Sequence, residues 1–145
     1  MLQEKQAQLG QASDRLDIGI MARSVLAPLI AWAAAVGLIA FSGYPGVICM
    51  TPMAWLMACW TGSFCAGRSR STAQRRLLEA AIAGALLGLA QGGIFYIMQY
   101  ALLPLQPDEV QKAMALSLGI LGFGTVISAL LSLCTAAMRN RRRRA

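Results

Sequence analysis

Histidine is absent from this sequence, and charged residues of either sign are scarce. Without an imidazole, the chain lacks the commonest general base, the commonest metal ligand and the usual axial ligand of haem. Only 13% of the residues are charged, against about 25% in an average soluble domain. The sequence also contains no nucleophile–base pair, paired acids or phosphate-cradling loop. We therefore expect a protein that is not an enzyme and holds no cofactor or metal.

The four cysteines, Cys49, Cys59, Cys65 and Cys134, form no CxxC pair and have no zinc-like spacing. All of them fall inside apolar tracts. This placement is typical of small buried hydrophobic residues rather than of disulfides or reactive thiolates.

Long uncharged apolar tracts are what the chain does have, because 57% of its residues are hydrophobic. A helix needs roughly 20 mainly apolar residues to cross the hydrocarbon layer of a bilayer. Four tracts meet that length, so the sequence predicts an all-α integral membrane four-helix bundle with antiparallel helices. The predicted spans are residues 24–41, 47–66, 77–103 and 113–138, preceded by a segment 1–23 and followed by a basic tail 139–145.

Basic residues indicate how the spans are oriented. Of the 13 Lys and Arg residues, all but Lys112 lie before the first span, between the second and third, or after the fourth. Because Lys and Arg are retained on the cytoplasmic side, we expect both termini to be cytoplasmic. The short loops suit a bacterial inner membrane. The residues expected to lock this topology and touch lipid headgroups are Arg68, Arg70, Arg75, Arg76, Arg139, Arg141, Arg142, Arg143 and Arg144. We expect no nucleic-acid partner, since no aromatic platform accompanies the basic tail.

The N-terminal 23 residues are polar and carry acidic side chains, unlike a signal peptide. Leu2, Leu9 and Leu16 repeat every seven residues. The segment is either a short amphipathic helix on the membrane surface or a loosely ordered tail.

The third span has a small residue at every fourth position: Ala80, Gly84, Gly88 and Gly92. Gln91 and Gln99 project onto the same face of a helix. In lipid, small residues let helix backbones approach, and amide side chains can bond across the gap. This glycine-zipper pattern favours a packing seam, and the alternative is a polar path through the bundle.

The fourth span has two faces of small residues. Gly119 and Gly122 lie on one side, and Ser117, Gly124 and Ser128 lie on the other. We interpret both as packing faces, one for the bundle and one for a partner. Hydroxyls lining a solute path are the alternative.

Glu79 stands near the start of the third span, three and four residues after Arg76 and Arg75. A carboxylate in a membrane segment is a functional hypothesis by default. Here we expect a paired side chain that extends toward the membrane surface, because arginines lie within reach on the helix.

Two short stretches resemble motifs of transport families. Met53 and Met57 resemble the MxxxM feature of eukaryotic-type copper transporters, whose Met-rich tail and three-helix plan are missing here. The stretch 59–64 resembles the N-x-x-G-S-F segment of small fluoride channels, but Cys59 replaces the asparagine.

Two functional classes follow. The first is a non-catalytic membrane protein that acts by contact, as an accessory subunit or a self-associating bundle, with lipid and other membrane subunits or itself as partners. The second is a small oligomeric channel or transporter for a solute or ion, lined by Gln91, Gln99 and the hydroxyls of the fourth span.

Overall fold

The computed structural model describes residues 18–41, 47–69, 72–102 and 107–142, and every helix bound given below falls within them. Four helices occupy nearly all of this part of the chain, as the apolar tracts predict. They are α2 (Ile18–Phe41), α3 (Val47–Arg68), α4 (Ala73–Leu102) and α5 (Pro107–Arg142).

Each helix extends beyond the apolar tract predicted for it, except at the end of α2, the start of α3 and the end of α4. The added residues are mostly polar or charged, as in the last turn of α5, where Arg139, Arg141 and Arg142 continue the helix. A helix needs apolar residues only where it meets hydrocarbon, so hydropathy underestimates its length. The proposed amphipathic segment lies mostly outside the described residues, which include only its last six positions, the start of α2.

Three of the four helices are long and apolar enough to cross a membrane, judged on the residues that the structure describes. Much of their apolar surface is exposed rather than buried against other helices, as in Ile30, Leu118 and Phe123. Water would disfavour such a surface, whereas lipid solvates it. A membrane location follows from this combination. The qualifying stretches are Ile18–Leu38, Ala73–Ile97 and Leu121–Arg142.

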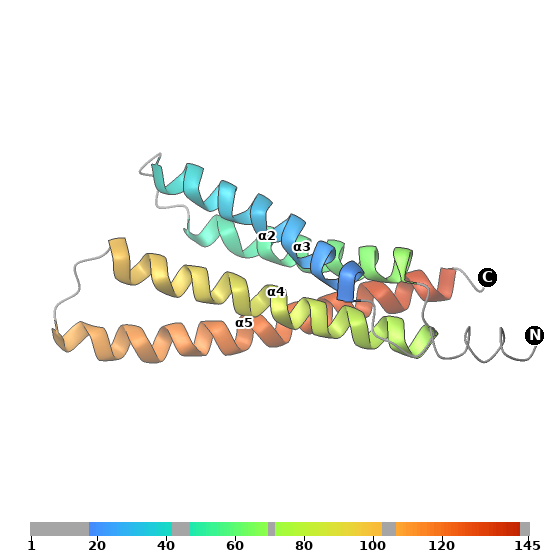
Figure 1. The fold of residues 1–145 in the computed structure, drawn as a ribbon. Coiled ribbons are helices and arrows are strands. Elements are labelled where there is room, and N and C mark those ends of the chain that lie inside the picture. The colour runs from blue at the N-terminus through green and yellow to red at the C-terminus, as the bar shows by residue number, and fades with distance from the viewer. Residues whose placement is uncertain (1–17, 42–46, 70–71, 103–106, 143–145) are drawn as a thin grey trace, which may run out of the picture.

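The four helices gather at one end and diverge toward the other (Figure 1). Helix α4 packs along α5, α3 packs on both, and α2 packs on α3 and α4. Toward the end where α2 and α4 finish, the α2–α3 pair leaves the α4–α5 pair. The end where they gather holds the end of α3, the start of α4 and the end of α5. Below it is called the arginine-rich end.

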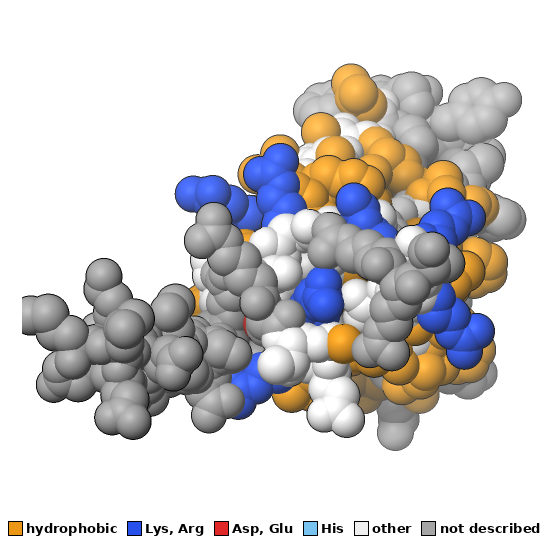
Figure 2. Space-filling model, turned by 90° about the vertical axis from the view of Figure 1, so that its right-hand side faces the viewer, with side chains coloured by type: hydrophobic (Ala, Val, Ile, Leu, Met, Phe, Trp, Pro, Cys, Tyr) orange, Lys and Arg blue, Asp and Glu red, His pale blue; other side chains and the backbone are white. Residues whose placement is uncertain are grey.

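Figure 2 views this end directly, and basic side chains gather over it in front of the hydrophobic surface. The sequence explains the pattern. Arg68 ends α3, Arg75 and Arg76 lie in the first turn of α4, and three arginines lie in the last turn of α5. Such an end suits the region where lipid headgroups meet water.

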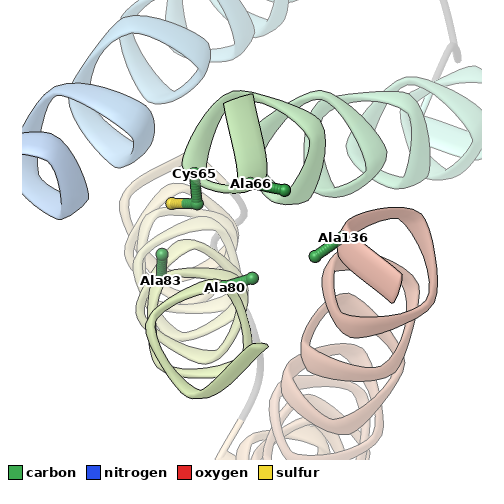
Figure 3. Packing of buried hydrophobic residues seen from close by; sticks show 5 residues of the cluster. All are labelled: Cys65, Ala66, Ala80, Ala83 and Ala136. Atoms are coloured by element: carbon green, nitrogen blue, oxygen red, sulfur yellow. The ribbon is translucent and has the colours of Figure 1, made fainter. Parts of the chain in front are cut away.

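Small side chains form the core near the arginine-rich end. Cys65 and Ala66 from α3, Ala80 and Ala83 from α4, and Ala136 from α5 are fully buried together (Figure 3). Alanine and cysteine occupy little volume, so three helix backbones can approach one another at this point. The core therefore depends on close backbone packing rather than on bulky apolar side chains.

Candidate functional site

The row of small residues on α4, named here the glycine row (Ala80, Gly84, Gly88 and Gly92), faces α5. A Cβ added to Gly84 would lie 2.6 Å from the carbonyl oxygen of Ser128, and one added to Gly88 would lie 2.7 Å from the Cα of Thr125. Any side chain larger than hydrogen would push the two helices apart here. Successive glycines meet earlier and earlier residues of α5, so α4 and α5 run in opposite directions.

A hydrogen bond adds to this contact. Ser132 of α5 donates its hydroxyl to the carbonyl oxygen of Ala80 at 2.6 Å, and both residues are buried. Ser128, predicted on a packing face, is also buried and lies against Gly84 and Gly88.

The other predicted positions have different surroundings. Gly119 and Gly122 are exposed, and no atom would lie within 4 Å of a Cβ added to either. Gly124 is half-buried, and a Cβ added to it would also meet nothing within 4 Å, although its carbonyl oxygen is close to Gly88. The side chains of Gln99 and Ser117 lie outside those that the structure describes.

A second row of α4 lies beside the glycine row and is named here the inner row: Glu79, Ala83, Leu87 and Gln91. All four side chains are buried. The sequence pattern placed Gln91 on the face of the glycines. The structure buries it, and the described residues supply no hydrogen-bond partner for its Nε2 atom.

Glu79 is 0% exposed. The prediction that it extends toward the membrane surface is therefore wrong. Helix α3 packs against α4 beside this position, since Cys65 of α3 and Ala80 of α4 belong to one buried cluster.

A set of polar side chains joins α2 to α3 near Glu79. Thr61 donates its hydroxyl to the carbonyl oxygens of Ser24 and Met57, both at 3.0 Å. The Cys65 thiol donates to Ser24 Oγ at 3.2 Å, and the Ser24 hydroxyl in turn donates to the carbonyl oxygen of Met21 at 2.7 Å. Ser24, Thr61, Cys65 and Glu79 are all buried, and we name them the polar cluster.

Sequence reasoning missed the polar cluster. Ser24, Thr61 and Cys65 are isolated small residues within or beside apolar tracts, and each can satisfy its own helix by bonding to a carbonyl one turn back. Only the register between helices brings them together. The one available signal was Glu79, since a carboxylate in a span demands polar neighbours.

Helix α3 also meets α5 closely. A Cβ added to Gly62 would overlap the carbonyl oxygen of Ser132. One turn further, Arg139 of α5 donates Nη1 to the carbonyl oxygen of Ser63 at 2.9 Å and to its Oγ at 2.7 Å. The Arg139 guanidinium lies across Gly67, where a Cβ would come within 2.9 Å of Cζ. This arginine therefore joins two helices as well as adding charge.

The other arginines divide by location. Arg68, Arg141 and Arg142 are exposed, and the Arg68 guanidinium lies 5.1 Å from the centroid of the Phe64 ring. Arg75 and Arg76 are half-buried. Arg70, Arg143 and Arg144 lie outside the described residues. Contact of the described arginines with lipid headgroups stays a prediction.

Trp32 of α2 carries a second buried donor for which the described residues supply no acceptor. This donor is Nε1, and the whole side chain is only 3% exposed. Among the described residues, no group of three or more His, Cys, Asp or Glu side chains gathers in a way that could hold a metal ion. The described cysteines, Cys59, Cys65 and Cys134, are free thiols.

No protein-family model, curated protein or solved structure matches the chain.

Proposed function

We propose that this chain is an integral membrane protein with four spans and a non-catalytic role, which acts by packing its helices against other membrane helices. It is either an accessory subunit of a larger complex or a bundle that associates with itself. The proposal includes α3 as a fourth span, antiparallel neighbours, and both termini on the cytoplasmic side of a bacterial inner membrane.

One observation carries the proposal: α5 has two faces of small residues, and among the described residues only one of them packs against another helix. The face containing Ser128 packs against Gly84 and Gly88. The face containing Gly119 and Gly122 has open space around its glycines, and the large apolar Leu118 and Phe123 beside it are exposed. Lipid chains gain little from a glycine surface, whereas a second helix can approach it closely.

The arginine-rich end supports the proposed orientation. Cations near a span favour the cytoplasmic side. The arginines gather at one end of the bundle, because α3 and α5 end there and α4 starts there. Membrane carboxylates and amides usually face protein, and both Glu79 and Gln91 are buried.

Association is tested by purifying the tagged chain in a mild detergent and measuring the protein mass of the particle by light scattering. We expect a mass above that of one 15.4 kDa chain, from partners or further copies. Gly122→Leu should reduce the mass to that of one chain while helicity is retained, because the bulky side chain blocks close approach. Gly37→Leu is the matched control, since Gly37 also has open space around it but lies on α2.

A particle of one chain in both wild type and Gly122→Leu contradicts the association proposal. The transport alternative has its own result. If the purified wild-type chain passes ions in liposomes and Gln91→Leu abolishes that flux, the chain is a channel or transporter instead.

A further inference from the structure

Two arginines of the arginine-rich end are held by other side chains, on the surface that α3 and α5 share. The Arg139 guanidinium of α5 lies across Gly67, and its Nη1 donates to the carbonyl oxygen and to Oγ of Ser63. The Arg68 guanidinium of α3 lies 5.1 Å from the centroid of the Phe64 ring. A guanidinium that is already held in place loses less conformational freedom when it binds an anion.

The two guanidinium groups lie on adjacent columns of α3. Ser63 and Gly67 are four residues apart and form one column, and Phe64 and Arg68 form the next. Arg139 covers the first column, and the Arg68 guanidinium lies over the second. From the width of a helix with its side chains, the two groups are roughly 10 Å apart or less. A phosphate placed between them can therefore accept hydrogen bonds from both.

Among the described residues, no carboxylate is placed to neutralise this pair from the surface. Glu79 is buried, and Asp108 and Glu109 lie at the start of α5, at the opposite end of that helix (Figure 1). Arg68 and Arg139 are both exposed. The bonds that Arg139 donates to α3 use Nη1, so they do not engage Nε and Nη2, the edge that can bind two oxygens of one phosphate.

An apolar surface continues along α3 from this pair. Phe64 and Trp60 lie one and two turns before Arg68, about 6 and 12 Å along the helix axis. Their ring centroids are 5.4 Å apart, and Trp60 is 46% exposed. The candidate span Leu121–Arg142 of the neighbouring α5 ends beside the arginines. Cations at the end of a span with exposed rings next to them match the two parts of a phospholipid, its phosphate and its acyl chain.

We propose that Arg68 and Arg139 bind the phosphate of one anionic phospholipid, whose acyl chain lies along Phe64 and Trp60. A lipid is favoured over a free phosphate because the rings offer an apolar surface that only an acyl chain can cover. The site is more specific than a general attraction between arginines and headgroups, since it depends on two held guanidinium groups. It concerns one chain and does not depend on association.

The test is native mass spectrometry of the full chain in a neutral detergent, with dioleoyl phosphatidylglycerol or dioleoyl phosphatidylcholine added. Wild type should bind one phosphatidylglycerol molecule about tenfold more tightly than phosphatidylcholine, because only the first has a net negative headgroup. Arg68→Gln should remove this preference. Arg141→Gln is the matched control, since it removes the same charge from an exposed side chain at the same end, and it should keep the preference.

Arg139→Lys tests the second arginine without changing the net charge. Lysine cannot bind a phosphate through two parallel hydrogen bonds, so the preference should weaken. Because Arg139 also joins α3 to α5, circular dichroism must show that this variant is folded. If it is not, Arg68→Gln decides the result, since Arg68 is exposed at the end of α3.

Three results would overturn the proposal. The first is equal binding of the two lipids by wild type, or an undiminished preference in Arg68→Gln. The second is an equal loss in Arg141→Gln and Arg68→Gln, which would show that net charge alone attracts the lipid. The third is displacement of the bound lipid by glycerophosphoglycerol, the headgroup without its chains, as effectively as by phosphatidylglycerol, which would indicate a site for a free phosphate.

Discussion

Gly88→Leu is expected to cause a large loss of stability, about 3 kcal/mol, because overpacking forces backbones apart. A Cβ alone would lie 2.7 Å from Thr125 Cα and 3.1 Å from Ser128 Cβ, and the first of these neighbours is main chain. The measurement is unfolding in mixed micelles of increasing SDS fraction, followed by circular dichroism.

Gly93→Leu is the matched control, because Gly93 lies on the same helix five residues away and a Cβ there would meet nothing within 4 Å. It should shift stability by no more than about 0.5 kcal/mol. Equal destabilisation by the two substitutions would mean that general helix effects, not the contact between α4 and α5, decide the result.

Gly62→Leu is expected to be the second severe change, since it separates α3 from α5. A Cβ at Gly62 would overlap the carbonyl oxygen of Ser132 and would also approach its carbonyl carbon to 2.7 Å. Main-chain atoms of a packed helix cannot rotate away as a side chain can, so we expect a loss of about 3 kcal/mol or more. The expected sign of separated helices is rapid labelling of Cys65, which is otherwise 0% exposed, by a thiol reagent in detergent.

The control for Gly62→Leu is Gly37→Leu on α2, where a Cβ would meet nothing within 4 Å. Cys65 should stay as slow to label in that variant as in wild type. Slow labelling of Cys65 in Gly62→Leu, with unchanged stability, would show that the approach of α3 to α5 tolerates a large side chain.

Hydropathy predicted the helices because a helix long enough to cross a membrane needs a continuous run of mainly apolar residues. The four-residue spacing of Gly84 and Gly88 predicted that they share one face of α4, because residues four apart lie on the same side of a helix whatever its neighbours are. Which helix packs against that row depends on how the helices are arranged in the bundle, and no pattern in the sequence shows this arrangement.

The same limit explains what was mispredicted or missed. Glu79 was expected near the membrane surface because its neighbours in sequence, Arg75 and Arg76, are charged. In the structure its side chain is 0% exposed instead. Gly62 gave no signal because it is a single glycine rather than part of a repeat, although its contact with Ser132 is among the closest in the fold. In the sequence, Trp32 is like any other aromatic residue in an apolar tract. Only the structure shows that its Nε1 is buried without an acceptor among the described residues.

Helices α2, α4 and α5 are long and apolar enough to cross a membrane. The fourth span and the direction of all four belong to the proposed function. Labelling of single cysteines with a membrane-impermeant maleimide on intact cells tests this most directly, in a chain whose four native cysteines are replaced. Gly43→Cys and Gln106→Cys should be labelled from outside, and Ser71→Cys only after the membrane is permeabilised. Labelling of Ser71→Cys on intact cells, or protection of Gly43→Cys, would contradict the proposed path of the chain through the membrane.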